Sequence, residues 1–231
     1  AMKQAILCGA RTSCIDTTEL PPVGPRDVVV RVAACGVCAS ELHRWQDGRQ
    51  APLALGHEVA GQGIAHGDAV ETFQIGDRVT GLFNNGFADM AMTTADRVTH
   101  LPDSIALADA FGEPIACAMS AARRTRVEPG DRVAIVGLGF MGLLMLQMIR
   151  LRGPAAIVGI DLREDARRAG ARLGADIVLD PEAGDQTHRL VLPYPRGARR
   201  GRGTAGSARS RPGSGPSRRN RGPRRRCCIT T

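Results

Sequence analysis

Lysine and aromatic residues are scarce in this chain of 231 residues. Lys3 is the single lysine among 31 basic residues, and the aromatic residues are one tryptophan, one tyrosine and five phenylalanines. The longest apolar stretch, 133–149, contains three glycines and is shorter than the roughly 20 residues that a membrane-spanning helix needs. We therefore expect no membrane-spanning helix and no membrane partner.

The cysteines do not form the even set that a disulfide framework requires. There are seven, at positions 8, 14, 35, 38, 117, 227 and 228, and no secretory signal pattern precedes them. This pattern favours a reducing, cytoplasmic location with free thiols.

Acidic residues are absent after residue 185. Thirteen arginines lie in 186–231, which leaves 18 basic and 23 acidic residues in 1–185, a net charge of −5. The formal charge of +8 for the whole chain therefore belongs to the tail and does not describe the part that can fold. The tail is rich in Arg, Gly, Pro and Ser and poor in apolar residues, so we predict that 186–231 is disordered.

Two explanations account for this tail. A shifted reading frame of a GC-rich gene yields mainly Arg, Gly, Pro, Ala and Ser, and we favour that explanation. The alternative is a genuine basic tail that binds RNA or an acidic partner through salt-sensitive contacts. Tyr194 is the one aromatic residue in the tail, so little is available to stack on bases, and nucleic acid is the less favoured partner.

Residues 1–125 have the pattern of an antiparallel, barrel-like β domain followed by a linking helix. Short β-rich runs alternate with turns rich in Gly, Pro, Asp and Asn, and a helical stretch follows near 114–124. The expected strands are 27–32, 57–63, 77–83 and 88–94.

Residues 126–185 have the pattern of a partial Rossmann domain. A buried strand at 132–136, a Gly-rich turn, an apolar helix to 151 and a second strand at 156–160 form a βαβ unit. A helix at 163–173 and a third strand at 176–179 follow. A complete doubly wound domain has about six strands, so this chain supplies roughly half of one. The predicted fold is thus mixed, an antiparallel barrel-like domain plus part of an α/β domain.

Cys38 and His57 are the strongest candidates for metal ligands. A thiolate and an imidazole suit zinc, and a catalytic zinc site needs only about three protein ligands. Either residue alone would more often be an ordinary buried side chain, and it is their spacing together with the later glycine motif that favours metal ligands. Cys35 could be a second ligand or a redox partner of Cys38, but no second Cys-x-x-Cys pair follows, so we favour a small buried residue.

The segment Gly137-x-Gly139-x-x-Gly142 predicts a dinucleotide-binding turn. It follows a strand and opens a helix, and Asp161 ends the next strand 19 residues later. The glycines allow backbone N–H groups and the helix N-terminus to approach a pyrophosphate. Asp161 would bind the adenosine ribose and repel a 2′-phosphate, which favours NAD over NADP, although nearby Arg163 weakens that preference.

Taken together, these motifs resemble the medium-chain, zinc-containing alcohol and polyol dehydrogenases, in particular the sorbitol dehydrogenase branch. The resemblance covers about 2–182. It rests on Gly-Val-Cys-Ala-Ser-Glu-Leu-His at 36–43, Gly-His-Glu at 56–58, Gly-Asp-Arg-Val at 76–79, Glu-Pro at 113–114, the glycine turn and Leu-Gly-Ala-Asp at 173–176.

The resemblance implies roles for individual residues. Cys38 and His57 correspond to zinc ligands, Glu58 to a ligand or close neighbour with a catalytic role, and Glu113 to a third ligand that is sometimes water-mediated. Ser40 matches the hydroxyl that takes the proton of the bound alcohol, and His43 the residue that passes it to solvent. The implied fold is a GroES-like catalytic domain followed by a Rossmann coenzyme domain.

The chain departs from the family pattern in three ways. Glu41 stands where the family usually has Asp, and a four-cysteine structural-zinc lobe is absent, so one catalytic zinc and no structural zinc are expected. Nothing after about residue 182 matches. The family forms homo-oligomers, but this state is doubtful here because the strands that pair across a dimer are missing.

These observations predict a zinc- and NAD-dependent oxidoreductase acting on a secondary alcohol or polyol, with impaired activity in this chain. The alternative is a non-catalytic zinc- or nucleotide-binding fragment whose basic tail binds nucleic acid. A third possibility, within the same class, is physiological reduction of an aldehyde or ketone. Trp45 is either a pocket wall or a packed aromatic residue.

Overall fold

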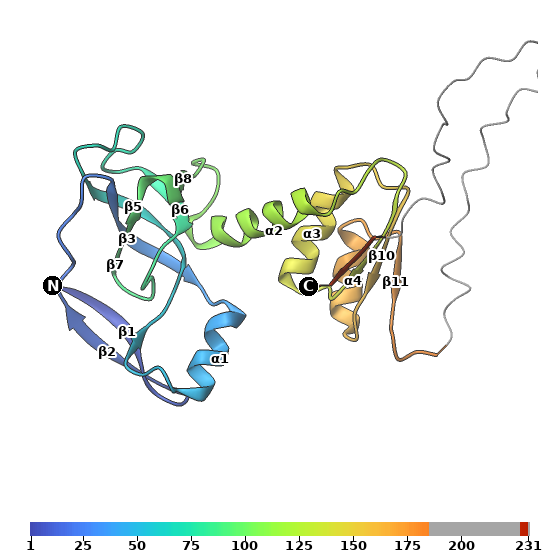
Figure 1. Cartoon of the computed structure of the whole chain (residues 1–231), viewed down its shortest axis with the longest axis horizontal. Helices are drawn as coiled ribbons and strands as arrows, with labels where there is room; N and C mark the ends of the chain where they lie inside the picture. Colours follow the sequence, from blue (N-terminus) through green and yellow to red (C-terminus); the bar gives the residue numbers. More distant parts are fainter. Residues whose placement is uncertain (185–226, 231) are drawn as a thin grey trace, which may run out of the picture. The chain divides into compact units, whose positions relative to one another are not determined.

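The computed structural model describes residues 1–184 and 227–230. The chain divides into two compact units, Ala1–Ser120 and Ala121–Thr231 (Figure 1). Within the described residues, no helix is long and apolar enough to cross a membrane. The tail predictions fall mostly on 185–226, outside the described residues.

The first unit is built on two open antiparallel sheets. One has the order β2-β1-β4 and the other β7-β3-β5-β6-β8. Their strands are β1 (Met2–Gly9), β2 (Thr12–Thr18), β3 (Asp27–Gly36), β4 (Leu53–Ala54), β5 (Glu58–His66), β6 (Arg78–Leu82), β7 (Met90–Thr94) and β8 (Val98–His100). The core of the larger sheet includes Val28, Val30, Val59, Val79 and Phe83, each fully buried.

The predicted antiparallel pairing of the barrel-like domain is confirmed, and its sheets are open. In the described part of the chain, β7 and β8 end the five-strand order and do not pair with each other. The edge strands β8 and β4 contain only three and two residues. They therefore offer few backbone groups for pairing with another strand. Isolated bridges from Gln4 to Ala88 and from Asn84 to Met92 add links between the strands and the loops around them, as do further backbone hydrogen bonds such as that from the Ala5 N–H to the Phe87 carbonyl.

A short helix that the sequence pattern did not reveal follows β3. This helix, α1 (Ala39–Asp47), begins where the Cys38 backbone N–H donates to the Glu41 carboxylate at 3.3 Å. It ends at Gly48, which adopts the left-handed conformation with φ 65° and donates its N–H to the Arg44 carbonyl. Short 3₁₀ turns lie at η1 (Ala95–Arg97) and η2 (Leu107–Asp109), and helix α2 (Gly112–Arg124) begins in the first unit.

The first unit also contains a disulfide that the sequence analysis did not expect. Cys8 and Cys14 are joined across the β1–β2 hairpin, with their Cα atoms 6.1 Å apart. The hairpin brings them together because β1 pairs with β2 through a register shift after Leu7. Among the described residues, Cys35, Cys38 and Cys117 are free.

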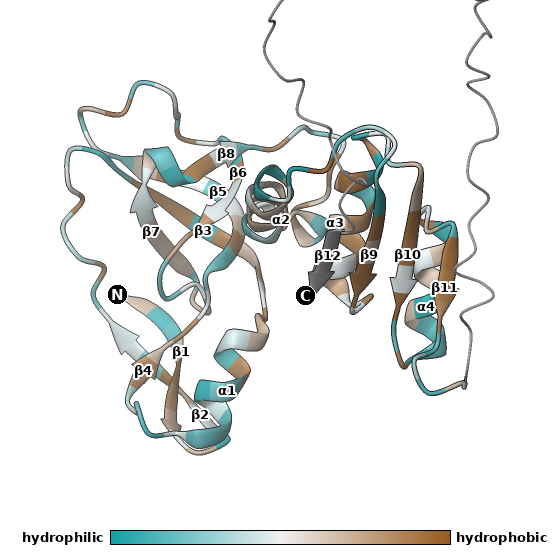
Figure 2. Ribbon diagram, turned by 45° about the vertical axis from the view of Figure 1, so that its right-hand side comes forward, coloured by the Kyte–Doolittle hydropathy of each residue, from teal (hydrophilic) through white to brown (hydrophobic). Residues whose placement is uncertain are grey.

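The second unit contains the predicted βαβ pattern in a parallel sheet of order β11-β10-β9-β12. The elements are β9 (Arg132–Val136), α3 (Phe140–Arg150), β10 (Ala156–Ile160), α4 (Glu164–Arg172), β11 (Ile177–Leu179) and β12 (Cys227–Thr230). Strand β9 is strongly hydrophobic (Figure 2). Strand β10 is buried over 156–159, as expected for a parallel strand covered on both faces, whereas Val136 at the end of β9 is 37% exposed.

Strand β12 corrects the prediction of a wholly disordered tail. Residues 227–230 pair in parallel with β9, with Cys227 opposite Val133 and Thr230 opposite Val136. This pairing satisfies backbone groups that β9 would otherwise expose on the side away from β10. It gives β12 the position that the fourth strand holds in a doubly wound sheet.

Candidate functional site

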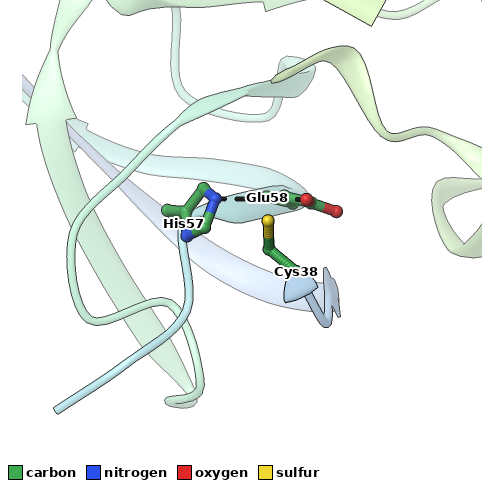
Figure 3. A group of neighbouring side chains, drawn as sticks. All are labelled: Cys38, His57 and Glu58. Atoms are coloured by element: carbon green, nitrogen blue, oxygen red, sulfur yellow. Dashed lines mark ion pairs between the residues drawn. The ribbon is translucent and has the colours of Figure 1, made fainter. Parts of the chain in front are cut away.

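Strand register brings the predicted metal ligands together from two distant segments. Strands β3 and β5 pair so that Gly36 lies opposite Glu58. Cys38 therefore leaves the end of β3 close to the point where His57 leads into β5. Candidate ligand atoms of Cys38, His57 and Glu58 all lie within 4.8 Å of one another, and the three side chains point toward a common space (Figure 3).

Glu41 fixes the orientation of the imidazole in this group. Its carboxylate is buried and accepts the backbone N–H of Gly56 at 2.5 Å, while the Nδ1 atom of His57 lies 3.0 Å from the same oxygen. Engagement of Nδ1 leaves Nε2 facing Cys38 and Glu58. A carboxylate on the far nitrogen is the usual outer contact of a metal-binding histidine.

Glu58 is held close to the backbone of the opposite strand. A Cβ atom added at Gly36 would lie 2.1 Å from Oε2 of Glu58, so only glycine leaves space for this side chain. Burial, followed by the negative charge of Glu113 and more weakly that of Glu41, raises the pKa of Glu58. A cation among these acids would relieve both effects, because opposite charge favours the ionised carboxylate.

Glu113 lies near this group but is not part of it. It occupies the first turn of α2 and accepts a hydrogen bond from the Cys117 thiol at 2.9 Å. That hydrogen bond, together with burial and the charge of Glu113, raises the pKa of Cys117 to about 11. Within the described residues, the set of mutually close ligand atoms contains Cys38, His57 and Glu58 without Glu113.

Among the described residues, Cys35 is also not part of the group of candidate metal ligands. Its thiol is half-buried, and its sulfur lies 3.6 Å from the Gly36 carbonyl oxygen. Burial, with the charges of Glu41 and Glu58, raises the pKa of Cys35 to about 12. In the absence of a metal ion, a thiol of this kind stays protonated at neutral pH.

The two residues predicted to move a proton lie on α1. Ser40 and His43 are both exposed, three positions apart and thus neighbours on the helix surface. The Ser40 hydroxyl lies 3.3 Å from the Cys38 sulfur. Ser40 is therefore beside the ligand group, and His43 follows it on the same helix.

The predicted nucleotide turn joins β9 to α3 in the second unit. Gly137 has φ 92°, a left-handed conformation that favours glycine, and its N–H donates to the Ile160 carbonyl at 2.8 Å. Gly139 is the N-cap residue of α3, and Gly142 is buried in its first turn. A Cβ atom at Gly139 would meet only the Arg163 guanidinium, at 3.9 Å, so this backbone is open to an approaching group.

The turn is tied to the end of β10 by Asp161. One carboxylate oxygen accepts the Leu138 N–H at 2.7 Å, and the other accepts the Arg163 N–H at 2.8 Å. Burial of Asp161 acts to raise its pKa, but these hydrogen bonds and the Arg163 charge outweigh it, and the pKa is lowered. Asp161 is therefore ionised at neutral pH and lies where the sequence analysis placed it.

Leu138 explains two further glycines around this turn. Its side chain is 1% exposed, and Cβ atoms at Gly159 and Gly170 would lie 2.9 and 2.8 Å from it. The glycines thus make room for Leu138 between β10 and α4.

Sequence reasoning missed the role of Gly36 and the helix-capping role of Glu41. Glu41 was noted as a departure from the family pattern close to the metal-binding histidine, but its spacing of three from Cys38 is also that of a helix-capping carboxylate. Gly36 gave no signal of its own, because its role depends on the register of β3 against β5.

The first unit thus brings Cys, His and Glu side chains together, and the second is a parallel unit with a glycine turn. Comparison with known proteins shows which proteins this chain resembles. Residues 24–103 match the alcohol dehydrogenase GroES-like domain. The sorbitol dehydrogenase of Bacillus subtilis is 29% identical over 215 residues, which cover 78% of this chain and 61% of that protein. The L-idonate 5-dehydrogenase of Vitis vinifera is 32% identical and is matched over 76% of this chain and 58% of its own length.

Solved structures give the same result. The 2R,3R-butanediol dehydrogenase of Bacillus subtilis has a TM-score of 0.71 and 25% identity, covering 82% of this chain and 66% of that chain. A Sinorhizobium meliloti protein solved with NADP bound has a TM-score of 0.72 and 28% identity, covering 80% of this chain and 63% of that chain. This chain is thus similar, over about three quarters of its length, to alcohol and polyol dehydrogenases, and 24–103 match the GroES-like domain of alcohol dehydrogenases. It spans about three fifths of the length of the curated relatives it matches.

Proposed function

We propose that this chain carries the metal centre and the pyrophosphate-binding turn of a zinc-dependent oxidoreductase that transfers a hydride between a secondary alcohol or polyol and NAD. The observation that carries the proposal is the grouping of Cys38, His57 and Glu58 within 4.8 Å, with Nδ1 of His57 already engaged by Glu41. Residues 1–125 would form the catalytic domain with its linking helix, and 126–185 the partial Rossmann domain.

The donor set fits a catalytic zinc. Cys38 would contribute its thiolate, His57 its Nε2 atom and Glu58 a carboxylate, and three protein ligands leave a position open for substrate. Glu113 would serve as a further ligand through water, since its charge already acts on Glu58. When bound, zinc supplies Lewis acidity that lowers the pKa of an alcohol.

The residues around this group would handle the proton of the alcohol. Ser40 lies 3.3 Å from the Cys38 sulfur and would accept the hydroxyl proton of a substrate held beside that ligand. His43, exposed on the same helix, would pass the proton to solvent. The negative charge of the Glu58 carboxylate would also act electrostatically on the oxygen of the substrate alcohol.

We propose NAD rather than NADP as the coenzyme. The ionised carboxylate of Asp161 would accept hydrogen bonds from the ribose hydroxyls and repel a 2′-phosphate. Each carboxylate oxygen can accept two hydrogen bonds, so the bonds from Leu138 and Arg163 do not exhaust it. Gly137, Gly139 and Gly142 would let the backbone approach the pyrophosphate. The relative solved with NADP makes this preference a point to test.

We further propose one zinc per chain, because 83–89 links β6 to β7 directly and contains no cysteine. The test is to measure zinc stoichiometry by elemental analysis, and NAD and NADP affinity by calorimetry, on the full chain. We expect about one zinc, lost in Cys38→Ser, and tighter binding of NAD than of NADP. Zinc retained equally in Cys38→Ser and His57→Gln would overturn the metal assignment.

Turnover is measured separately with sorbitol and 2,3-butanediol, the substrate types named for the relatives. Formation of NADH at about 1 per second or more would refute the prediction of impaired activity, because that rate is normal for enzymes.

A further inference from the structure

A second concave site lies in the first unit, beside the metal ligands but separate from them. It is a cavity of about 280 Å³ between strand β1 and helix α1. Leu7 of β1, Leu42 and Trp45 of α1, and Phe87 supply its walls, and Ser13 of β2 lies at one side. Cys38, His57 and Glu58 do not line it.

The chemistry of the walls selects the class of ligand. Eight of the ten lining residues are apolar, and the two others are Ser13 and Glu41. An apolar cavity of about 150 Å³ is large enough to bind benzene, so this volume accommodates one substituted ring. Trp45 and Phe87 contribute aromatic rings to the lining, and aromatic pairs favour offset or edge-to-face contact.

The polar groups at the cavity do not call for a charged ligand. The Glu41 carboxylate is buried and already accepts hydrogen bonds from the N–H groups of Gly56 and Cys38, besides its contact with His57. No basic residue lines the cavity. An anion would meet the Glu41 charge without compensation, and a cation would displace contacts that hold the histidine.

Apolar side chains are also exposed at the edge of the cavity. Val37 is 75% exposed and Leu42 is 43% exposed, and both line it. Solvent-exposed apolar groups around an apolar cavity favour entry of a ligand that can cover them.

We propose that the cavity between β1 and α1 is a binding site for a small, neutral aromatic molecule, distinct from the substrate position beside Cys38. Occupancy would bury the exposed edges of Val37 and Leu42 and would place the ligand against Trp45.

Trp45 makes the proposal directly testable, because it is the only tryptophan of the chain. Iodobenzene, a neutral ring carrying a heavy-atom quencher, is titrated into the full chain while tryptophan emission is followed. We expect quenching that saturates. Iodide ion, a charged quencher of the same heavy atom, should give linear quenching without saturation.

Variants that fill the cavity complete the test. Ser13→Leu and Ala5→Leu place a larger side chain in the walls and should weaken iodobenzene binding by at least about tenfold, that is about 1.4 kcal/mol. Thr17→Leu is the matched control, since Thr17 is exposed on the same strand β2 and does not line the cavity. Circular dichroism checks that each variant is folded. Two cavity-filling variants are used so that the test still stands if one of them does not fold.

Metal binding and cavity binding can fail independently. Cys38→Ser should bind iodobenzene as tightly as the wild type, even though it loses zinc. Linear quenching in the wild type, or equal affinity in Ser13→Leu, Ala5→Leu and Thr17→Leu, would overturn the proposed site.

Discussion

The two candidate sites are built in opposite ways. The metal group consists of side chains from the ends of β3 and β5, brought together by long-range pairing of antiparallel strands. The nucleotide turn consists mainly of backbone from one continuous segment, Gly137 to Gly142, with Asp161 as its main side-chain contact. A side-chain site depends on register and on what each neighbour leaves open, whereas a backbone site depends on glycines that keep side chains away.

This comparison predicts that the metal group is most sensitive to its ligand atoms. Cys38→Ser should lower the affinity for Co²⁺, used in place of zinc, by at least about 100-fold, because even outer contacts change metal affinity by about 10–100-fold. Loss of the thiolate-to-cobalt absorption band measures it. Cys35→Ala is the control and should keep both the band and the affinity, since Cys35 is outside the ligand group.

Contacts behind the ligands should have the next largest effect. Glu41→Gln removes the charge that faces Nδ1 of His57 while keeping the shape of the side chain. We expect Co²⁺ affinity to fall about 10–100-fold. Thermal unfolding of the metal-free protein serves as a check, and an unchanged cobalt affinity would show that Glu41 does not orient His57.

Strand register leaves room for the Glu58 side chain opposite Gly36. Filling that room should weaken metal binding less than removing a direct contact. Gly36→Ala introduces a Cβ atom 2.1 Å from Oε2 of Glu58, so the carboxylate must move. We expect about tenfold weaker Co²⁺ binding, at the low end of outer-contact effects. Gly9→Ala, also in a strand but with no atom within 4 Å of the added Cβ, is the matched control and should bind Co²⁺ normally. Equal affinities in the two variants would count against a role for Glu58.

A substitution in the nucleotide turn should weaken NAD binding and leave the free energy of unfolding nearly unchanged. At Gly139 an added Cβ would meet only Arg163, at 3.9 Å, so Gly139→Ala should change the free energy of unfolding by less than about 0.5 kcal/mol. It should nevertheless weaken NAD binding about fivefold, because the methyl group occupies space needed by the pyrophosphate. Gly159→Ala gives the converse case, since its Cβ would press on Leu138 and cost about 1 kcal/mol of stability. Calorimetric titration and thermal unfolding of both variants separate these outcomes.

The contrast between a site of distant side chains and a site of continuous backbone also explains how much of each could be predicted from the sequence. Strands β9 and β10 and helix α3 were predicted almost to their ends, because their apolar runs and glycines are local signals. Helix α1 was not predicted, because the spacing of three between Cys38 and Glu41, which marks its start, was not recognised as a helix cap. Strand β2 was not predicted, because it is largely exposed and its sequence has no alternation of apolar residues. Without the β1–β2 hairpin, the proximity of Cys8 and Cys14 could not be predicted either.

The candidate site residues divide in a similar manner. The sequence identified Cys38, His57 and Glu58, and the structure brings their ligand atoms together. Their chemical roles, and those of Ser40, His43 and Glu113, stay predictions. The open form of the sheets and the place of Gly36 could not be predicted, because both depend on which strands pair and in what register.

The pairing of Gly36 with Glu58 has an entropic consequence for metal binding. Cys38 and His57 are 19 residues apart, and closing a flexible loop of that length carries a length-dependent cost of about 2.5 kcal/mol. Pairing of β3 with β5 closes this loop through backbone hydrogen bonds that do not involve a metal ion. Zinc binding would therefore not have to order the chain, unlike in zinc fingers, which are unfolded without metal. A chelator should then empty the site while the amide protons of β3 and β5 remain protected from exchange.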